Sequence, residues 1–465
     1  MILVAHSFCL RRDRKQFERS KPYAPLATLL AAAILREHGH PVALFDATFE
    51  PCIDGFASQL AASNPQIVLL IEDNFNYLTK MCTEDRRADA LRMIAAARRA
   101  GAQVAVNGPD ALDHPRLYLD AGAHAVMSGE GELGAAALVE ALQRNEPLET
   151  IPGLILLGAS GALHHTPPRR QEQALDALPF PAWDLVDAQS YRDIWTRAHG
   201  RFSWNMAASR GCPYACNWCA KPTFGRRYTQ RSAASIAEEM ARLKREVAPD
   251  HIWFADDIFG MTGDWIAAFA EEVTRRDAGI PFTMQSRANL ITEPVATALA
   301  ASGAEEVWLG VESGSQRILD AMDKGTRVES VRAATRTLRR HGIRSGWFLQ
   351  LGYPPEDWED ILLTRDLLRD ERPDEIGVSV SYPLPGTVFH DRVVAELGAR
   401  RNWRDTDELA MLFQGTFDTA FYRMVRDALH ADVDAGMVDE LRWHDLARQA
   451  DTHRSSSPLR IELRA

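Results

Sequence analysis

The sequence predicts an α/β protein with two parallel sheets in succession, followed by a small helical C-terminal region. Short apolar runs alternate with helix-period segments through the first ~150 residues, which is typical of a doubly wound sheet. A second such series begins at Trp204 and has six strand–helix units, which predicts a partial (βα)6 barrel. After Pro385-Gly386 the pattern is mainly helical. The expected segments are 1–150, a linker at 151–195, the barrel at 196–390 and the C-terminal region at 391–465.

Five strands are expected in the N-terminal region, at 2–7, 41–46, 67–72, 103–107 and 125–128. The first helix presents one apolar face, closed by Gly39 and formed by Leu26, Leu29, Leu30, Ala33 and Ile34. The next segment is rich in proline and has little periodicity, so a linker is expected there.

In the second series, strands are expected at 204–209, 251–255, 281–286, 306–312, 344–351 and 376–382. Ser235 to Glu238 has the pattern of a capping box at a helix start. A second helix runs through Val331 and Leu338 and is expected to stop at Gly342.

Composition excludes several functions. The formal net charge is −11 and the sequence pI is about 5.7, which weighs against a nucleic-acid-binding surface. The N-terminal residues lack the pattern of a signal peptide, and the apolar run from Leu26 to Leu35 is far shorter than the ~20 residues of a membrane span. We therefore expect a cytoplasmic enzyme that acts on a small-molecule substrate, with no nucleic-acid partner.

Three of the six cysteines, Cys212, Cys216 and Cys219, form the pattern CxxxCxxC. Clustered cysteines in such a chain point to metal binding rather than to disulfides. Thiolates are the ligands of iron–sulfur clusters, and three of them leave one iron of a cubane free to bind another group. A structural zinc or redox site remains an alternative, although such sites use four protein ligands.

The segment Ser209-Arg-Gly-Cys-Pro-Tyr-Ala-Cys-Asn-Trp-Cys resembles the signature of the radical S-adenosylmethionine (SAM) superfamily. The resemblance implies that the three cysteines hold a 4Fe-4S cluster whose open iron binds SAM. Reductive cleavage of SAM would then give a 5'-deoxyadenosyl radical, with the electron supplied by a donor such as flavodoxin or ferredoxin. Trp218 would pack beside the adenine.

The same resemblance implies further SAM contacts at the ends of successive strands. Asp256 and Asp257 would meet the methionine ammonium, and Arg287 would pair with its carboxylate. Glu312, beside Ser313, would accept hydrogen bonds from the ribose. Taken singly, Asp256 and Glu312 can also be read as a helix cap or an ion-pair partner.

The N-terminal region resembles the flavodoxin-like, cobalamin-binding module of cobalamin-dependent radical SAM enzymes. The resemblance places a corrinoid at the strand ends, near Asp73 and Asn74, Asn107 and Gly108, and Gly129 and Glu130. The loop after the first strand lacks the Asp-x-His-x-x-Gly motif of many cobalamin proteins, which fits a cobalt without a histidine ligand. A sheet that binds flavin, or no ligand, is the alternative.

Together these resemblances predict cobalamin-dependent methylation of an unactivated carbon. Two alternatives stay open. One is cobalamin-dependent cyclisation, oxidation or rearrangement without methyl transfer, as in the anaerobic magnesium-protoporphyrin ester cyclase. The other is a non-catalytic iron–sulfur or corrinoid carrier.

Overall fold

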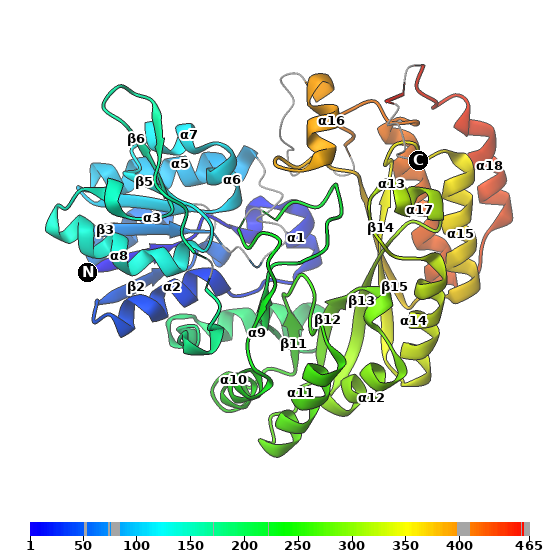
Figure 1. Ribbon diagram of the computed structural model, residues 1–465, viewed down its shortest axis with the longest axis horizontal. Coiled ribbons are helices and arrows are strands. Elements are labelled where there is room, and N and C mark those ends of the chain that lie inside the picture. Colours follow the sequence, from blue (N-terminus) through cyan, green and yellow to red (C-terminus); the bar gives the residue numbers. More distant parts are fainter. Residues whose placement is uncertain are drawn as a thin grey trace.

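The computed structural model describes residues 1–50, 54–72, 75, 84–170, 172–221, 223–397, 410–456 and 458–459. Figure 1 shows two α/β sheets side by side, the N-terminal one on the left and the second on the right. Within the described ranges, no helix is long and apolar enough to cross a membrane.

The N-terminal sheet has the strand order β2-β1-β3-β4-β5-β6-β7. Its strands are β1 (Ile2–Ala5), β2 (Val42–Phe45), β3 (Ile67–Ile71), β4 (Gln103–Asn107), β5 (Ala125–Met127), β6 (Leu154–Leu157) and β7 (Leu163–His165). The first five strands are parallel and lie where the sequence predicts them. The last two form an antiparallel hairpin on β5, so β5 is not an edge strand.

The expectation of a five-stranded sheet followed by a plain linker is therefore wrong. The segment 151–195 contains the β6–β7 hairpin and helix α9 (Ala188–His199). The hydroxyl of Thr166 accepts a hydrogen bond from the backbone N–H of Leu154 at 2.8 Å, and Gly161 makes the turn with φ +78°. Strands of three and four residues among prolines are too short to show a period.

Helices cover both faces of the N-terminal sheet. Ile2 and Val4 point to a core shared with α2 (Leu26–Glu37) and α8 (Gly131–Arg144). Leu3 and Ala5 point to the opposite core, which contains residues of α3 (Asp54–Ser63), α5 (Glu84–Arg99) and α7 (Pro115–Asp120). This alternation is the two-residue period of a strand buried on both faces. The described residues of this half also contain two short helices, α1 (Arg14–Arg19) and α6 (Pro109–Asp113).

The second sheet has the order β15-β14-β13-β12-β11-β8, with all neighbours parallel. Its strands are β8 (Ser203–Met206), β11 (His251–Phe254), β12 (Phe282–Ser286), β13 (Ala304–Glu312), β14 (Arg344–Leu351) and β15 (Glu375–Val380). β8 and β15 are the open edges, so the sheet is a half-barrel, and each of the six predicted strands is present. The helices after these strands are α10 (Ala233–Glu246), α11 (Gly263–Arg275), α12 (Glu293–Ser302), α13 (Gln316–Ala321), α14 (Val328–Arg340) and α15 (Trp358–Glu371).

Helix boundaries agree with the sequence prediction at one of two places. Helix α14 ends at Arg340, and Gly342 follows with φ +70°, as expected for a glycine that closes a helix. Helix α10, however, begins one turn before the predicted capping box. Its N-cap is Ser232, whose hydroxyl accepts from the N–H of Ser235 at 3.1 Å. The start was ambiguous in the sequence because Ser232 and Ser235 can each cap a helix.

The C-terminal region consists of α16 (Val388–Leu397), α17 (Thr419–Ala435) and α18 (Glu440–Ala450). Figure 1 shows α17 and α18 beside α15, on the outer side of the half-barrel. The indole N–H of Trp443 donates to Asp432 at 2.6 Å and joins these two helices. After α18 the chain returns to the segment before α17, where the N–H of Ser455 donates to the carbonyl of Thr416 at 2.9 Å.

Candidate functional site

The cysteine loop leaves the half-barrel at the carboxyl end of its first strand. After β8 the chain enters the two-residue strand β9 (Ser209–Arg210), carries the three cysteines, and returns in β10 (Thr229–Gln230), which is antiparallel to β9. Gly211 has φ +77°, and a Cβ atom there would lie 2.1 Å from the carbonyl oxygen of Arg227. Only glycine fits this position, so the base of the loop is closed by its own backbone.

The three cysteines of this loop form no disulfide, and Cys216 is buried whereas Cys212 and Cys219 are half-buried. Burial raises the pKa of the Cys212 thiol, and the nearby Lys221 ammonium partly opposes this. In the described part of the chain, no three His, Cys, Asp or Glu side chains converge on a point that a single ion would occupy. Three thiolates suit a 4Fe-4S cubane, which binds each cysteine through a different iron and leaves the fourth iron open, whereas a structural zinc site takes four protein ligands. The residues fit a cluster better than zinc.

Asn217, between two of the cysteines, makes more loop contacts than sequence reasoning anticipated. Its side-chain amide donates to the carbonyl of Ala321 at 2.8 Å and to Asp323 at 3.0 Å. Its Oδ1 accepts from the hydroxyl of Tyr353 at 2.7 Å. Its backbone N–H donates to the carbonyl of Met322 at 3.0 Å. The sequence shows only that a short polar residue, Asn217, lies within the cysteine motif. It does not indicate the hydrogen-bond partners of Asn217.

Trp218 packs against an apolar cluster to which α13, α16 and the neighbouring loops contribute. The cluster includes Met322, Leu384 and Phe389. Its indole N–H is buried and makes no hydrogen bond to the described residues. The ring is therefore held by packing, with one donor left over for another group.

Asp256 and Asp257 follow β11, the strand beside β8. Asp256 is 1% exposed, and its carboxylate accepts from the N–H of Ala208 at 3.1 Å and from the Ser209 hydroxyl. Burial raises the pKa of Asp256 to about 7, although these hydrogen bonds lower it. Asp257 is half-buried, and its charge raises the pKa of Cys212. The structure thus brings both aspartates to the cysteine loop, with Asp256 holding the loop's stem.

Arg287, directly after β12, lies against the cysteine loop. One guanidinium nitrogen donates to the sulfur of Cys216 at 3.6 Å, and the guanidinium carbon lies 3.6 Å from the centre of the Tyr214 ring. The other nitrogen donates to the carbonyl of Lys324 and to the hydroxyl of Thr326.

Glu312 ends β13 in the left-handed conformation, with φ +65°. Its carboxylate pairs with the ammonium of Lys324 at 2.7 Å, and both side chains are about 6–7% exposed. Ser313 accepts from the N–H of Ser315 at 3.1 Å and so shapes the turn after the strand. Lys324, which the sequence did not single out, contacts both Glu312 and Arg287.

At the ends of the N-terminal strands, Asn107 and the glycines shape the backbone. The buried Asn107 side chain donates to the carbonyls of Met127 at 2.8 Å and Gly129 at 3.2 Å. Gly108 has φ +156°, and a Cβ there would lie 2.9 Å from the Glu72 side chain. Asp73 and Asn74, the other predicted residues of this edge, lie outside the described residues.

Glu130 joins the two halves of the molecule. Its carboxylate pairs with the guanidinium of Arg210, which also lies 3.0 Å from Glu132. All three side chains are at most 4% exposed. The guanidinium lies over the rings of Phe75 and Phe224, whose centres are 4.9 Å apart. Strand ends of the N-terminal sheet therefore contact the residue that precedes Gly211 and Cys212.

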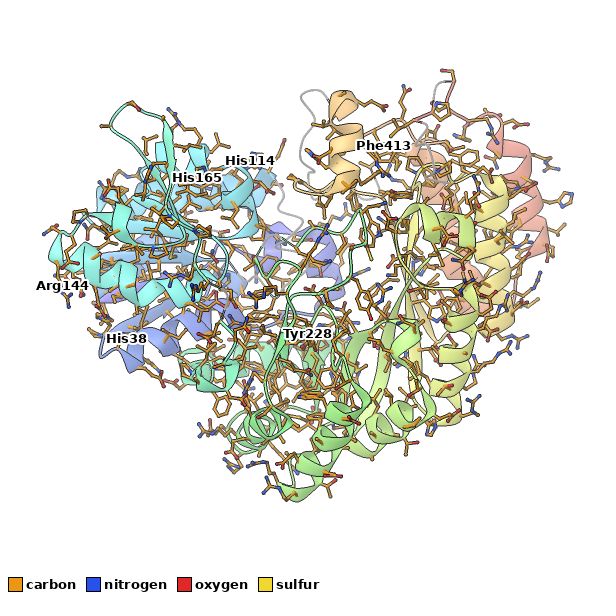
Figure 2. All side chains as sticks on the ribbon, in the orientation of Figure 1. His38, His114, Arg144, His165, Tyr228 and Phe413 are labelled. Atoms are coloured by element: carbon orange, nitrogen blue, oxygen red, sulfur yellow. The ribbon has the colours of Figure 1, made fainter. Side chains whose placement is uncertain are left out.

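The returning strand completes the site in the middle of the molecule. Figure 2 shows Tyr228, the residue before β10, between the two sheets. Its hydroxyl donates to the carbonyl of Ile258 at 3.2 Å, and burial raises its pKa above the ordinary value.

The part of the chain that contains this loop is similar to a known family. Residues 206–368 match the model of the radical SAM superfamily. This range begins at the end of β8 and contains the three cysteines and β11 to β14.

Three curated relatives match most of the chain. An uncharacterized methyltransferase of Pyrococcus horikoshii is 28% identical over 82% of this chain and 81% of its own length. The hopanoid C-3 methylase of Methylococcus capsulatus is 27% identical over 78% of this chain and 67% of its own. The anaerobic magnesium-protoporphyrin IX monomethyl ester cyclase of Synechocystis is 25% identical over 69% of this chain, which spans 63% of that enzyme.

A solved structure shares the fold of both halves. The radical SAM methyltransferase TsrM of Kitasatospora setae, with cobalamin and a [4Fe-4S] cluster bound, superimposes with a TM-score of 0.68 at 20% identity. The match covers 86% of this chain and 76% of that protein.

Proposed function

We propose that this chain, which carries a radical SAM domain, uses SAM and cobalamin to methylate an unactivated carbon of a small molecule. The observation that carries the proposal is the position of the cysteine loop. Cys212, Cys216 and Cys219 follow the first strand of a half-barrel, and the adjoining Arg210 contacts Glu130 at the strand ends of a second α/β sheet. Two cofactor-binding edges thus meet at one place.

The chain's own residues hold the first cofactor. The three cysteines supply its thiolates, Gly211 closes the loop, and Asn217 ties it to the chain after α13. When bound, a 4Fe-4S cluster supplies the electron that cleaves SAM to methionine and a 5'-deoxyadenosyl radical. Such a radical removes hydrogen from carbons that no side-chain base can deprotonate. The buried surroundings keep water away from it.

For SAM, we assign contacts at the neighbouring strand ends. The indole N–H of Trp218 has no partner among the described residues, and its ring has an apolar face suited to the adenine. The half-buried Asp257 is assigned to the methionine ammonium, beside Asp256, whose buried carboxylate accepts from Ala208 and Ser209. Glu312 and the adjacent Ser313 would contact the ribose. In Glu312 the contact would use Oε2, because Lys324 pairs with Oε1.

For cobalamin, we assign the carboxyl edge of the N-terminal sheet. Its first five strands have the order 2-1-3-4-5, which is that of flavodoxin-like folds, and such sheets bind large ligands at this edge. Asn107 fixes the loop that contains Gly129, and Gly108 allows close backbone approach. Asp73 and Asn74, which lie outside the described residues, remain cobalamin contacts predicted from the sequence alone. Glu130 would act at this edge by holding Arg210, rather than by contacting cobalamin directly.

A second candidate function keeps both cofactors and omits methyl transfer. The 25% identity to an anaerobic magnesium-protoporphyrin ester cyclase favours it, and cyclisation or oxidation would use the same hydrogen removal. A non-catalytic carrier is disfavoured by the polar residues gathered at successive strand ends.

The test is anaerobic reconstitution followed by reaction with SAM that carries a labelled methyl group. We expect absorption from cluster and cobalamin, 5'-deoxyadenosine after reduction, and label in the product. Deoxyadenosine without labelled product would favour cyclisation, and no deoxyadenosine would favour a carrier. The Cys216→Ala variant should lose SAM cleavage. Continued cleavage by that variant contradicts the role of the triplet.

A further inference from the structure

Arg287 is a buried cation whose partners carry no formal negative charge. Its side chain is 4% exposed. It donates to the sulfur of Cys216, the carbonyl of Lys324 and the hydroxyl of Thr326, and it stacks on Tyr214. In the described part of the chain, no carboxylate lies within ion-pair distance of this guanidinium. The neighbouring carboxylate, Glu312, is paired with Lys324 instead.

A buried charge without a counter-ion is costly, and proteins retain one where an anion binds. The guanidinium faces Cys216, a sulfur that becomes a thiolate when it ligates iron. Donors to a thiolate are charge-assisted and roughly twice as strong as neutral hydrogen bonds. The position of the cation therefore matches the charge of a cluster ligand.

We propose that Arg287 is the counter-ion of the Cys216 thiolate and that its N–H donation raises the reduction potential of the cluster. Reduction adds one electron to the cluster from an external one-electron donor and so adds one negative charge. A fixed cation stabilises the reduced form more than the oxidised form, because the reduced form is more negative. Hydrogen bonds to cluster sulfurs act in the same direction. Arg287 thus acts on the cluster through Cys216 by stabilising its reduced form, in addition to any contact with SAM.

This inference rests on the proposed function, because it needs the cluster. The first measurement is therefore iron and sulfide content of the reconstituted wild-type protein, with the electron paramagnetic resonance signal of a reduced cubane. If the wild-type protein gives no such signal, the proposed function fails. The role of Arg287 is tested only on protein that passes this step.

The test compares reduction potentials without SAM, so that the SAM carboxylate plays no part. We expect Arg287→Gln to lower the ratio of reduced to oxidised cluster at a fixed potential by about tenfold, which equals a shift of about 59 mV for one electron. Arg287→Lys keeps the charge and should shift less. Arg226→Gln is the matched control, because it removes an equal charge from an exposed residue near the loop, where solvent screens it.

A potential for Arg287→Gln equal to that of the wild type, combined with weaker SAM binding, would overturn the proposal and leave Arg287 as a SAM ligand alone. If the Arg287→Gln variant fails to fold, a second measurement tests the proposal on the wild-type protein. Electron–nuclear double resonance of the reduced wild-type protein, labelled with ¹⁵N-arginine, should show a nitrogen coupled to the cluster. Absence of that coupling also overturns the proposal.

Discussion

The hydroxyl of Tyr353 donates a hydrogen bond of 2.7 Å to Oδ1 of Asn217, across 136 positions of sequence. Tyr353 follows β14, and Asn217 lies between two cysteines of the loop after β8. The same hydroxyl lies 3.2 Å from the carbonyl of Ala321, which also accepts from Asn217. Two strand-end loops and the end of α13 are thus joined at one amide, directly beside Cys216.

We expect Tyr353→Phe to lower both stability and cluster content. The change leaves the buried Oδ1 of Asn217 without its donor, which costs roughly 1–3 kcal/mol. Urea unfolding of the apo-protein measures the stability. The iron content per chain after reconstitution measures how well the cysteine loop holds the cluster. Tyr214→Phe is the control, because in the described part of the chain the Tyr214 hydroxyl has no partner. Equal losses in the two variants would contradict the role of the Tyr353 hydrogen bond.

The ion pair between Glu312 and Lys324 should show strong coupling. Either Glu312→Gln or Lys324→Met leaves one buried charge unpaired, which costs about 3–5 kcal/mol. The double variant removes both charges and should recover part of that loss. A double-mutant cycle of unfolding free energies checks this. Additive effects of the two changes would mean that the pair contributes no net coupling.

Asp256 should make stability depend on pH. Its pKa in the folded protein is about 7, above the ordinary value of 3.8, because it is buried. Between about pH 4 and pH 7 the folded state therefore binds more protons than the unfolded state, and stability falls as pH rises. Asp256→Asn removes this titrating group. As pH rises through that range, the free energy of unfolding of the variant should therefore increase relative to that of the wild type by roughly a few kcal/mol. A constant difference between the two proteins at pH 4.5 and pH 8 would refute it.

The contact between the two halves should depend more on Arg210 than on either carboxylate. Arg210→Met removes the buried cation that pairs with Glu130 and Glu132, and we expect a loss of about 3–5 kcal/mol. Glu132→Gln should cost less, because one guanidinium then serves one carboxylate instead of two. The free energies of unfolding of the variants are compared by urea denaturation, with tryptophan fluorescence as the probe. A larger loss for Glu132→Gln would reverse this order of importance.

Much of the fold could be predicted from local patterns. The first five strands of the N-terminal sheet, and β11, β13 and β14 of the half-barrel, each have at least three apolar residues in succession, as buried parallel strands require. Polar residues or glycine separate the apolar ones in β8, β12 and β15. The hairpin at Leu154–His165 escaped prediction because its strands are short and lie among prolines. The start of α10 was misplaced because Ser232 and Ser235 are equally good caps by sequence.

The candidate site divides in the same way. Local spacing and ligand chemistry predicted a cluster site at the cysteine triplet, and the resemblance to radical SAM enzymes predicted Asp256, Arg287 and Glu312 at the strand ends. Their partners depend on which strand ends become neighbours, and only the tertiary structure decided these. Arg287 meets Cys216 across 71 positions, and Arg210 meets Glu130 across 80. No local period encodes such pairings, because they arise when parallel strands bring their carboxyl ends to one edge.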